Sequence, residues 1–297
     1  MPLNKSYSSL EGTFKSSSPQ GSHIFYKHYF SSKWERGREK KRTHIIFQHG
    51  MIEYHKRHEE FIEFVMENYE GAICISVMDL LGHGLSGGER AFVENFNIFL
   101  EDYKHFCNLC IEDLYKERNV STFMMAHSLG ALITLRAIGD GHQLKIKPKG
   151  VILVSPCIKP KLEIPKYVYL GARELPSPIK SLRLPVVYNA YDLTQDNEKA
   201  ISFIQDPLIS KFITMQLGLE TIEASRQIHG LSYFLKSPCL FVLSGDDDVV
   251  DVEKTKLFIA GMNKSLVKVL YYKDAKHDIL NETCRSEVFQ EIMNYIQ

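Results

Sequence analysis

The chain has 297 residues, 44% of them hydrophobic, and its 36 lysines and arginines balance its 36 aspartates and glutamates. This length and composition are typical of a soluble protein with a large core, and a net charge of zero provides no field that would attract nucleic acid. No apolar run approaches the roughly 20 residues of a membrane helix. These properties argue against a membrane-spanning protein and against a nucleic-acid partner.

The N-terminal stretch 1–21 is rich in serine and lacks the apolar centre of a signal peptide. Several cysteines, such as Cys74 and Cys239, lie in strand-like apolar runs, and the C-x-x-C pair Cys107 and Cys110 has neither a second pair nor a nearby histidine. We therefore expect reduced thiols, no metal or cofactor, and a cytoplasmic protein that is either free or peripheral at a membrane.

Short apolar runs alternate with segments of helical spacing along most of the chain. The predicted strands are 44–48, 72–78, 122–126, 150–154, 239–243 and 266–272. The predicted helices are 59–69, 97–116, 129–139, 253–260 and 287–295. The charged run 35–42 (ERGREKKR) is interpreted as a solvated hairpin loop between two strands. The alternation predicts an α/β fold with a mostly parallel central sheet and helices on both faces.

The alternation stops between residues 157 and 235, where prolines separate short helical pieces. We interpret this segment as an inserted, mainly helical cap, so that residues 1–156 form the first part of the core, 157–235 the cap and 236–297 the second part of the core. Most of its apolar stripe should pack onto the core, while a few members should line an apolar approach to the site. The stripe comprises Ile209, Phe212, Ile213, Met215, Leu217, Leu219 and Ile222.

The segment 126–130 (AHSLG) follows a predicted strand and opens a predicted helix. This is the setting of a nucleophile elbow with Ser128 at its tip; the alternative is a serine that only caps the helix. A hydroxyl nucleophile needs a base, and the base needs an acid. His277 follows the last predicted strand, and the adjacent aspartates 246–248 follow the strand before it. Chemistry alone leaves the choice among these aspartates open.

Acyl transfer also requires donors for the developing oxyanion. The backbone N–H of Leu129 follows the nucleophile directly, and the N–H of Met51 lies in the loop after the strand 44–48. We predict both as donors, with His49 holding that loop by hydrogen bonds. Residues 79–86 (DLLGHGLS) are interpreted as a shaped structural loop beneath the site.

These motifs resemble the monoglyceride lipase and lysophospholipase family of α/β-hydrolases, also described as serine aminopeptidase-like hydrolases. Residues 49–57 (HGMIEYHKR) look like the family's H-G-x-G-E-H-x-x-R, with departures at Ile52 and Tyr54. Residues 79–90 look like D-x-x-G-H-G-x-S-x-G-x-R, and 126–130 resemble its G-H-S-M/L-G elbow. The stretch 245–248 (GDDD) resembles G-x-x-D, which selects Asp248 as the acid, and His277 fits the family's last-loop histidine.

The resemblance implies the α/β-hydrolase fold and a serine carboxylic-ester hydrolase that acts through an acyl-enzyme on Ser128, with Asp248 and His277 completing the triad. It implies a monoacylglycerol or lysophospholipid as the small-molecule substrate. A short-chain esterase or peptidase of the same fold is one alternative. A scaffold that binds a ligand without turnover is another, and the complete set of triad residues argues against it. Transient contact of the cap with a membrane surface and the oligomeric state are left open.

Overall fold

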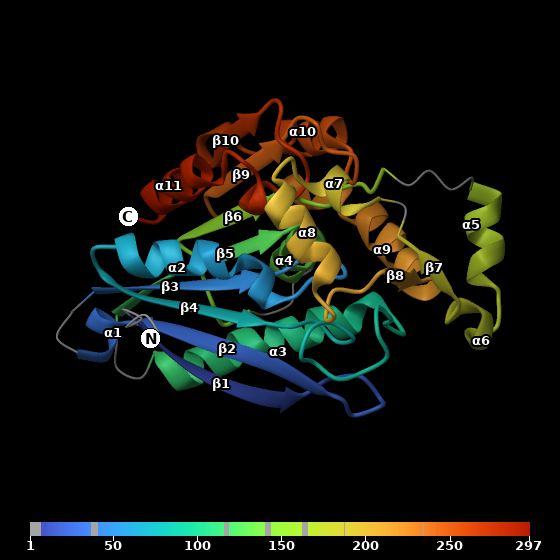
Figure 1. Ribbon diagram of the computed structural model, residues 1–297, viewed down its shortest axis with the longest axis horizontal. Helices are drawn as coiled ribbons and strands as arrows, with labels where there is room; N and C mark the ends of the chain where they lie inside the picture. The colour runs from blue at the N-terminus through green and yellow to red at the C-terminus, as the bar shows by residue number, and fades with distance from the viewer. Residues whose placement is uncertain are drawn as a thin grey trace.

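The computed structural model describes residues 7–36, 41–115, 119–139, 144–161, 166–186, 188–233 and 235–297. Eight of its described strands form a large sheet in the order β1-β2-β4-β3-β5-β6-β9-β10 (Figure 1). Their bounds are β1 Tyr7–Lys15, β2 His23–Ser31, β3 Lys41–Gln48, β4 Ala72–Met78, β5 Asn119–His127, β6 Gly150–Val154, β9 Cys239–Ser244 and β10 Val267–Tyr272.

From β4 through β10 neighbouring strands run parallel, while β1 and β2 are antiparallel at one edge. Strands β4, β6 and β9 are buried along their whole length, as the continuous apolar runs of the sequence predict for strands that are covered on both faces. The mostly parallel central sheet is thereby confirmed.

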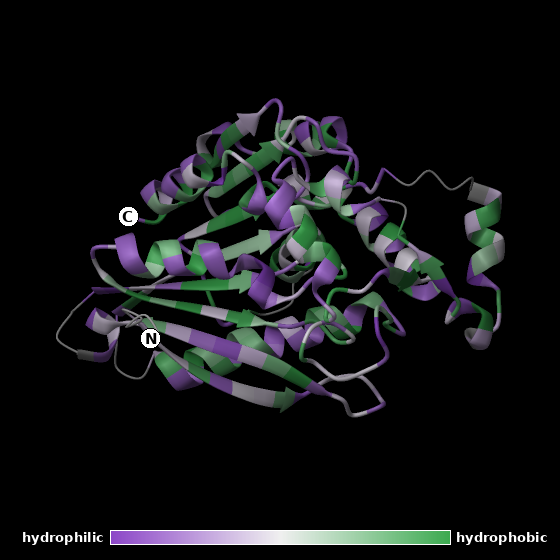
Figure 2. Cartoon of the chain, viewed as in Figure 1, coloured by the Kyte–Doolittle hydropathy of each residue, from purple (hydrophilic) through white to green (hydrophobic). Residues whose placement is uncertain are grey.

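Helices cover both faces of this sheet. On one face, α3, α4 and α10 bury apolar side chains in one core cluster, and on the other face α2 and α11 bury theirs in a second cluster. The bounds are α2 Glu59–Asn68, α3 Phe96–Leu114, α4 Leu129–Gly139, α10 Val252–Ala260 and α11 Arg285–Ile296. Figure 2 shows the hydrophobic residues concentrated in the central strands between these layers. The sheet's carboxyl edge is consequently supported from both sides.

The expected hairpin at 35–42 is wrong. A short helix, α1 (Ser32–Arg36), follows β2, and β3 begins at Lys41, while residues 37–40 lie outside the described part of the chain. β2 pairs antiparallel with β4, which separates it from β3. The partner of β2 is thus chosen by a long-range contact, and the two strands that flank the charged run are not neighbours.

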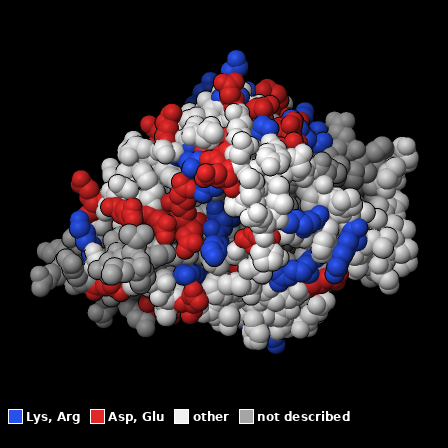
Figure 3. All heavy atoms as spheres, viewed as in Figure 1, with Lys and Arg blue, Asp and Glu red and all other residues white. Residues whose placement is uncertain are grey.

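Between β6 and β9 lie residues 157–235, the predicted cap, which we call the cap segment. Its elements are α5 Lys166–Arg173, α6 Ser177–Lys180, β7 Arg183–Pro185, α7 Ala190–Leu193, α8 Asn197–Gln205, β8 Phe212–Thr214 and α9 Met215–Gln227. In Figure 1, α7 and α8 lie against the core, whereas α5 and α6 project away from it on the right. Among the described helices, none combines the length and the apolar character required to cross a membrane. Figure 3 shows acidic and basic side chains side by side on the visible face, as the balanced composition predicts.

Candidate active site

Ser128 stands at a tight turn between β5 and α4. Its φ is 51°, in the left-handed region that non-glycine residues rarely adopt. The backbone N–H of Ser128 donates to the carbonyl of Val154 at 3.0 Å, and its own carbonyl accepts from Cys157 N–H at 3.1 Å. These bonds to the chain after β6 hold the strained turn, as a nucleophile elbow requires.

Gly130 explains how closely the turn packs. A Cβ at this position would lie 2.4 Å from the carbonyl oxygens of Gln48 and His49 at the end of β3. Any side chain would push the start of α4 away from that strand. The glycine therefore brings the elbow against residues 49–53, which we call the oxyanion loop after the donor predicted at Met51.

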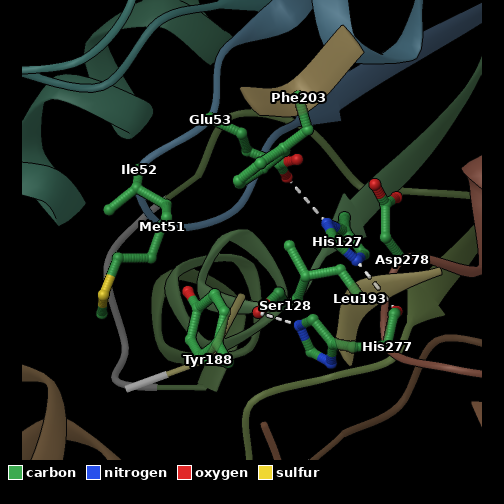
Figure 4. Close-up of a pocket in the computed structure, with 10 residues that line it drawn as sticks. All are labelled: Met51, Ile52, Glu53, His127, Ser128, Tyr188, Leu193, Phe203, His277 and Asp278. Carbon is green, nitrogen blue, oxygen red and sulfur yellow. Dashed lines mark hydrogen bonds and ion pairs between the residues drawn. The ribbon is translucent and has the colours of Figure 1, made fainter. Parts of the chain in front are cut away.

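His277 connects the serine to a carboxylate. Its Nε2 lies 2.9 Å from Ser128 Oγ (Figure 4). Its Nδ1 lies 2.7 Å from an oxygen of Asp247. The Asp247 carboxylate selects the tautomer in which Nδ1 carries the proton, leaving Nε2 free to accept the serine proton. The imidazole and the carboxylate are both buried. Ser128 and His277 are therefore brought together as the sequence predicts.

The predicted acid, Asp248, does not reach His277. Its side chain is 64% exposed and lies 3.3 Å from the Lys161 amine. The carboxylate at His277 is Asp247, whose second oxygen accepts from the N–H groups of Val249 and Val250 at 2.8 and 2.9 Å. That turn directs Asp247 inward and its neighbours outward, so the choice of Asp248 is corrected to Asp247. Burial acts to raise the pKa of Asp247, but His277 and these N–H groups outweigh it and lower the pKa.

The oxyanion loop is held on several sides. His49 Nδ1 donates to the carbonyl of Gly50 at 2.7 Å, while its Nε2 accepts the N–H of Leu80 at 2.9 Å. The N–H of Gly50 donates to Glu53 Oε1 at 2.7 Å. A Cβ on Gly50 would lie 3.0 Å from Cβ of Ser128, so the loop passes directly beside the nucleophile. Met51, whose backbone N–H is the predicted donor, is the next residue and lines the cavity beside Ser128.

A buried charged group lies behind the nucleophile. Glu53 Oε1 accepts from His127 Nδ1 at 2.7 Å and from His58 Nε2 at 3.1 Å. Burial lowers the pKa of His127, but the Glu53 charge and hydrogen bond outweigh it and raise the pKa to about 9. Burial acts to raise the pKa of Glu53, and the two histidines hold it well below its usual value. At neutral pH the pair Glu53–His127 is therefore ionised.

Among the described residues, Glu53, His58 and His127 also place three possible metal-ligand atoms close enough together to hold a metal ion. The same Glu53 oxygen already accepts hydrogen bonds from Gly50, His58 and His127. These atoms are thus bonded to one another, although His58 Nδ1 has no hydrogen-bond partner among the described residues, and we interpret the three side chains as a structural network. The signal in the sequence was the H-G-x-x-E pattern, but nothing in that pattern shows that its acid faces the histidine before Ser128.

The loop 79–86 has the structural role expected of it. Asp79 accepts from the backbone N–H of His55 and Leu85, each at 2.9 Å, and from His55 Nδ1 at 2.8 Å. Ser86 Oγ donates to the backbone carbonyl of Asp79 at 2.6 Å. Both side chains fix backbone groups beneath the site, and neither lines the cavity beside Ser128.

The cavity beside Ser128 is small, about 20 Å³, which is room for about one water molecule. Its cap-segment walls are Tyr188, Leu193 and Phe203 (Figure 4). The apolar stripe around Phe212 and Leu217 packs into the core instead. Most of the stripe thus packs in buried clusters, as predicted, but the expectation that a few members line the approach to the serine is not met in the cavity shown. No periodic pattern in the sequence marks the three actual walls.

Several known proteins are similar to this chain in sequence or in structure. Phospholipase YtpA of Bacillus subtilis (strain 168) is 25% identical over 250 residues, 83% of this chain and 92% of that protein. Monoglyceride lipase of Homo sapiens is 23% identical over 260 residues, 85% of this chain and 81% of that protein. The crystal structure of a soluble variant of monoglyceride lipase from Saccharomyces cerevisiae, in complex with a substrate analogue, has a TM-score of 0.79 at 18% identity and covers 95% of this chain and 94% of that chain. This last likeness shows the shared fold.

The family model described as serine aminopeptidase, S33, matches residues 39–284, which include the oxyanion loop, the elbow, Asp247 and His277. The resemblance that the sequence motifs carry is thereby confirmed. The chain belongs to this family of α/β-hydrolases and is similar in sequence to monoglyceride lipases and to a phospholipase.

Proposed function

We propose that the protein hydrolyses carboxylic esters through an acyl-enzyme on Ser128. The observation that carries the proposal is the continuous chain of hydrogen bonds from Ser128 Oγ through His277 to Asp247, at 2.9 and 2.7 Å. A chain of this kind activates a hydroxyl, because the imidazole accepts the proton as the oxygen attacks.

The reaction proceeds in two halves. Ser128 Oγ attacks the ester carbonyl carbon and transfers its proton to His277 Nε2, while Asp247 stabilises the imidazolium. The N–H groups of Leu129 and Met51 stabilise the oxyanion. His277 then gives its proton to the departing alcohol, which leaves an acyl group on Ser128. Water attacks this acyl group with His277 as base, the fatty acid leaves, and the proton returns to Ser128.

A monoacyl lipid, a monoacylglycerol or a lysophospholipid, is the substrate class we propose. The similarity to monoglyceride lipases and to a phospholipase supports it, as does the position of the cap segment, whose apolar side chains Leu193 and Phe203 face Ser128. A long acyl chain gains about 0.8 kcal/mol for each CH₂ that it buries. Since ligand pockets usually measure about 300–1,000 Å³, these walls must move outward to admit such a chain.

A short-chain esterase or peptidase is the second candidate, and the cavity of about 20 Å³ favours it. A small acyl group requires less displacement of Tyr188 and Phe203 than a fatty acyl chain does. The two candidates share the same chemistry at Ser128 and differ in how far the cap segment opens. Hydrolysis rates for p-nitrophenyl esters of increasing acyl length distinguish them: a lipase gains with length until its pocket is full, whereas a short-chain esterase loses.

Labelling with a fluorophosphonate probe tests the chemistry itself. We expect the protein to be labelled on Ser128, and Ser128→Ala to lose both labelling and esterase activity, with turnover reduced by about 10⁴- to 10⁶-fold. The variant should stay folded, because the side chain removed is small. A Ser128→Ala variant that hydrolyses esters nearly as well as the parent contradicts the mechanism, and an unlabelled parent supports a binding scaffold.

A cytoplasmic location and transient contact with a membrane surface are part of the same proposal. The six cysteines are all unpaired, which is typical of a reducing compartment. The projecting part of the cap segment exposes Tyr167, Leu170 and Leu182, with 78%, 50% and 54% of their surfaces accessible. An exposed apolar surface of this kind is suited to contact with a lipid surface. We propose that the protein takes its substrate from that surface.

A further inference from the structure

Ile52 has a backbone conformation that its own side chain disfavours. Its φ is 61°, in the left-handed region where a β-branched residue is an outlier. Such a residue keeps this conformation only when its surroundings impose it. In the family pattern H-G-x-G-E that residues 49–53 resemble, this position is a glycine, which adopts positive φ freely. In this chain, contacts from other residues must therefore keep Ile52 at positive φ, whereas a glycine would adopt this conformation without them.

Residues of the cap segment provide these contacts with Ile52. The Ile52 side chain is 3% exposed and packs in an apolar cluster, and its carbonyl accepts the N–H of Ser210 at 3.1 Å. Apart from Ile52 and Tyr54, the buried members of this cluster belong to the cap segment, namely Ala190, Leu193, Ala200, Phe203 and Ile209. Packing and hydrogen bonding thus both tie Ile52 to the cap segment.

Relaxation at Ile52 displaces the residue before it. Glu53 is fixed by its bonds to Gly50, His58 and His127, so a change of φ at Ile52 moves Met51 relative to Glu53. Met51 carries the proposed oxyanion donor and lines the cavity at Ser128 (Figure 4). The conformation of Ile52 therefore decides whether this donor points at the reacting carbonyl.

We propose that Ile52 is a positioning residue through which the seated cap segment holds the oxyanion loop in its working shape. This inference rests on the proposed function, because it assigns the loop a role in stabilising the oxyanion. When Ile209 and Ser210 of the cap segment leave Ile52, the contacts that hold this residue are lost, the loop relaxes, and the N–H of Met51 turns away. Catalysis is then coupled to cap position in this chain, without any cap residue that takes part in the chemistry.

The test compares Ile52→Gly with Ile52→Ala. Both variants lose the packing, but only alanine keeps the penalty for positive φ, which shifts an equilibrium by roughly 5- to 30-fold. On a short, water-soluble ester we expect kcat for Ile52→Gly to exceed kcat for Ile52→Ala by about that factor, with similar KM, because oxyanion donors act in the transition state. A role in packing alone gives the opposite order, since glycine is the smaller and more flexible residue.

Ile209 provides the matched control, because it is an isoleucine of the same cluster, also 3% exposed, and is not among the residues with positive φ. There we expect Ile209→Gly to be no better than Ile209→Ala. Ile209→Ala should lower kcat in the parent chain but leave it unchanged in the Ile52→Gly background, where the loop no longer depends on the cap segment. Equal losses in both backgrounds overturn the coupling.

Thermal unfolding gives a readout that does not depend on activity. Ile52→Gly should melt above Ile52→Ala, the reverse of the order at Ile209. If the parent chain proves inactive and unlabelled by fluorophosphonate, the proposed function fails, while the order of melting temperatures still tests the strain. If the melting order is as expected but the kcat order is not, the strain is present and the coupling to the oxyanion loop is wrong. If alanine equals or exceeds glycine at position 52 in both measurements, the inference is overturned.

Discussion

The surroundings of Ser128 and the projecting segment 166–186 differ in which side chains they bury and which they expose. Around Ser128, polar side chains are buried and have several fixed partners each, as Glu53 and Asp247 show. In the projecting segment, Tyr169 and Arg173 are tied to Glu223 of α9, another cap-segment helix, while large apolar side chains face outward.

The difference separates two tasks. Many short hydrogen bonds among buried groups select one arrangement of atoms, which acyl transfer requires. An exposed apolar surface selects no arrangement and suits contact with variable partners such as acyl chains. We therefore expect single-atom changes near Ser128 to affect turnover strongly, and larger changes in residues 166–186 to leave the chemistry intact.

The largest effect is expected at Asp247. Asp247→Asn should reduce kcat by about 10⁴-fold, because an amide at Nδ1 favours the wrong imidazole tautomer. Asp248→Asn is the matched control one residue away, on an exposed side chain, and should change kcat by less than about twofold. Steady-state rates on a short ester measure both. The reverse ranking of the two variants shows that the turn at 245–248 is arranged differently in solution.

The next effect concerns the ion pair behind the nucleophile. The folded-state pKa of His127, about 9, lies above the ordinary value of 6.5, so the folded protein holds this proton more tightly than the unfolded chain does. The stabilisation is complete below about pH 6.5 and is lost as the pH rises to about 9, by about 3 kcal/mol. Urea unfolding across this range measures it.

Glu53→Gln is the companion variant, since it removes the charge that keeps His127 protonated. Its free energy of unfolding should be lower by about 3–5 kcal/mol at pH 6.5, because it leaves a buried cation without its partner. The decline between pH 6.5 and 9 should then largely vanish. A variant that keeps the slope of the parent assigns this pH dependence to another group.

A smaller effect is expected at the ion pairs that join the cap segment to the core. Arg285 lies 2.7 Å from both Glu60 on α2 and Asp196 at the start of α8. Because these side chains are partly exposed, Arg285→Gln should lower the free energy of unfolding by only about 0.5–1 kcal/mol. Lys268→Gln, which removes a more exposed pair with Glu291, should change it by less. If Arg285→Gln lowers the free energy of unfolding by several kcal/mol, the two ion pairs of Arg285 act cooperatively.

The smallest effect on chemistry is expected in the projecting segment. Leu170→Ser and Leu182→Ser alter exposed side chains and should change kcat on a short ester by less than about twofold. The same variants should reduce hydrolysis of long-chain monoacylglycerol presented in vesicles. Equal losses on both substrates contradict the division between the two regions.

The sequence predicted the parts of the molecule that local patterns determine. The strands 72–78 and 150–154 agree with β4 and β6 residue for residue, and the helix 129–139 agrees with α4. Ser128 and His277 were found because a strand–turn–helix pattern and a position after the last strand mark them. Each of these signals is contained in a short stretch of chain.

The errors arise where contacts in the folded chain, local or distant, determine the position of a side chain. Three adjacent aspartates have the same local chemistry, and only the turn that binds Asp247 to Val249 and Val250 turns it inward. The register of the family pattern at 245–248 did not capture that turn. The walls formed by Tyr188 and Phe203 depend likewise on how the cap segment folds back over the sheet, which no spacing along the chain encodes.

The order of strands in the sheet also has a consequence for synthesis. The elbow at Ser128 is complete once β5, α4 and β6 have formed, but its partner His277 is 149 positions further along the chain. Asp247 and His277 arrive with β9 and β10, which extend the sheet beyond β6. A chain still growing on the ribosome therefore carries Ser128 without its proposed base until synthesis has passed residue 277. The proposed activity thus cannot appear in the shorter, partly synthesised chain.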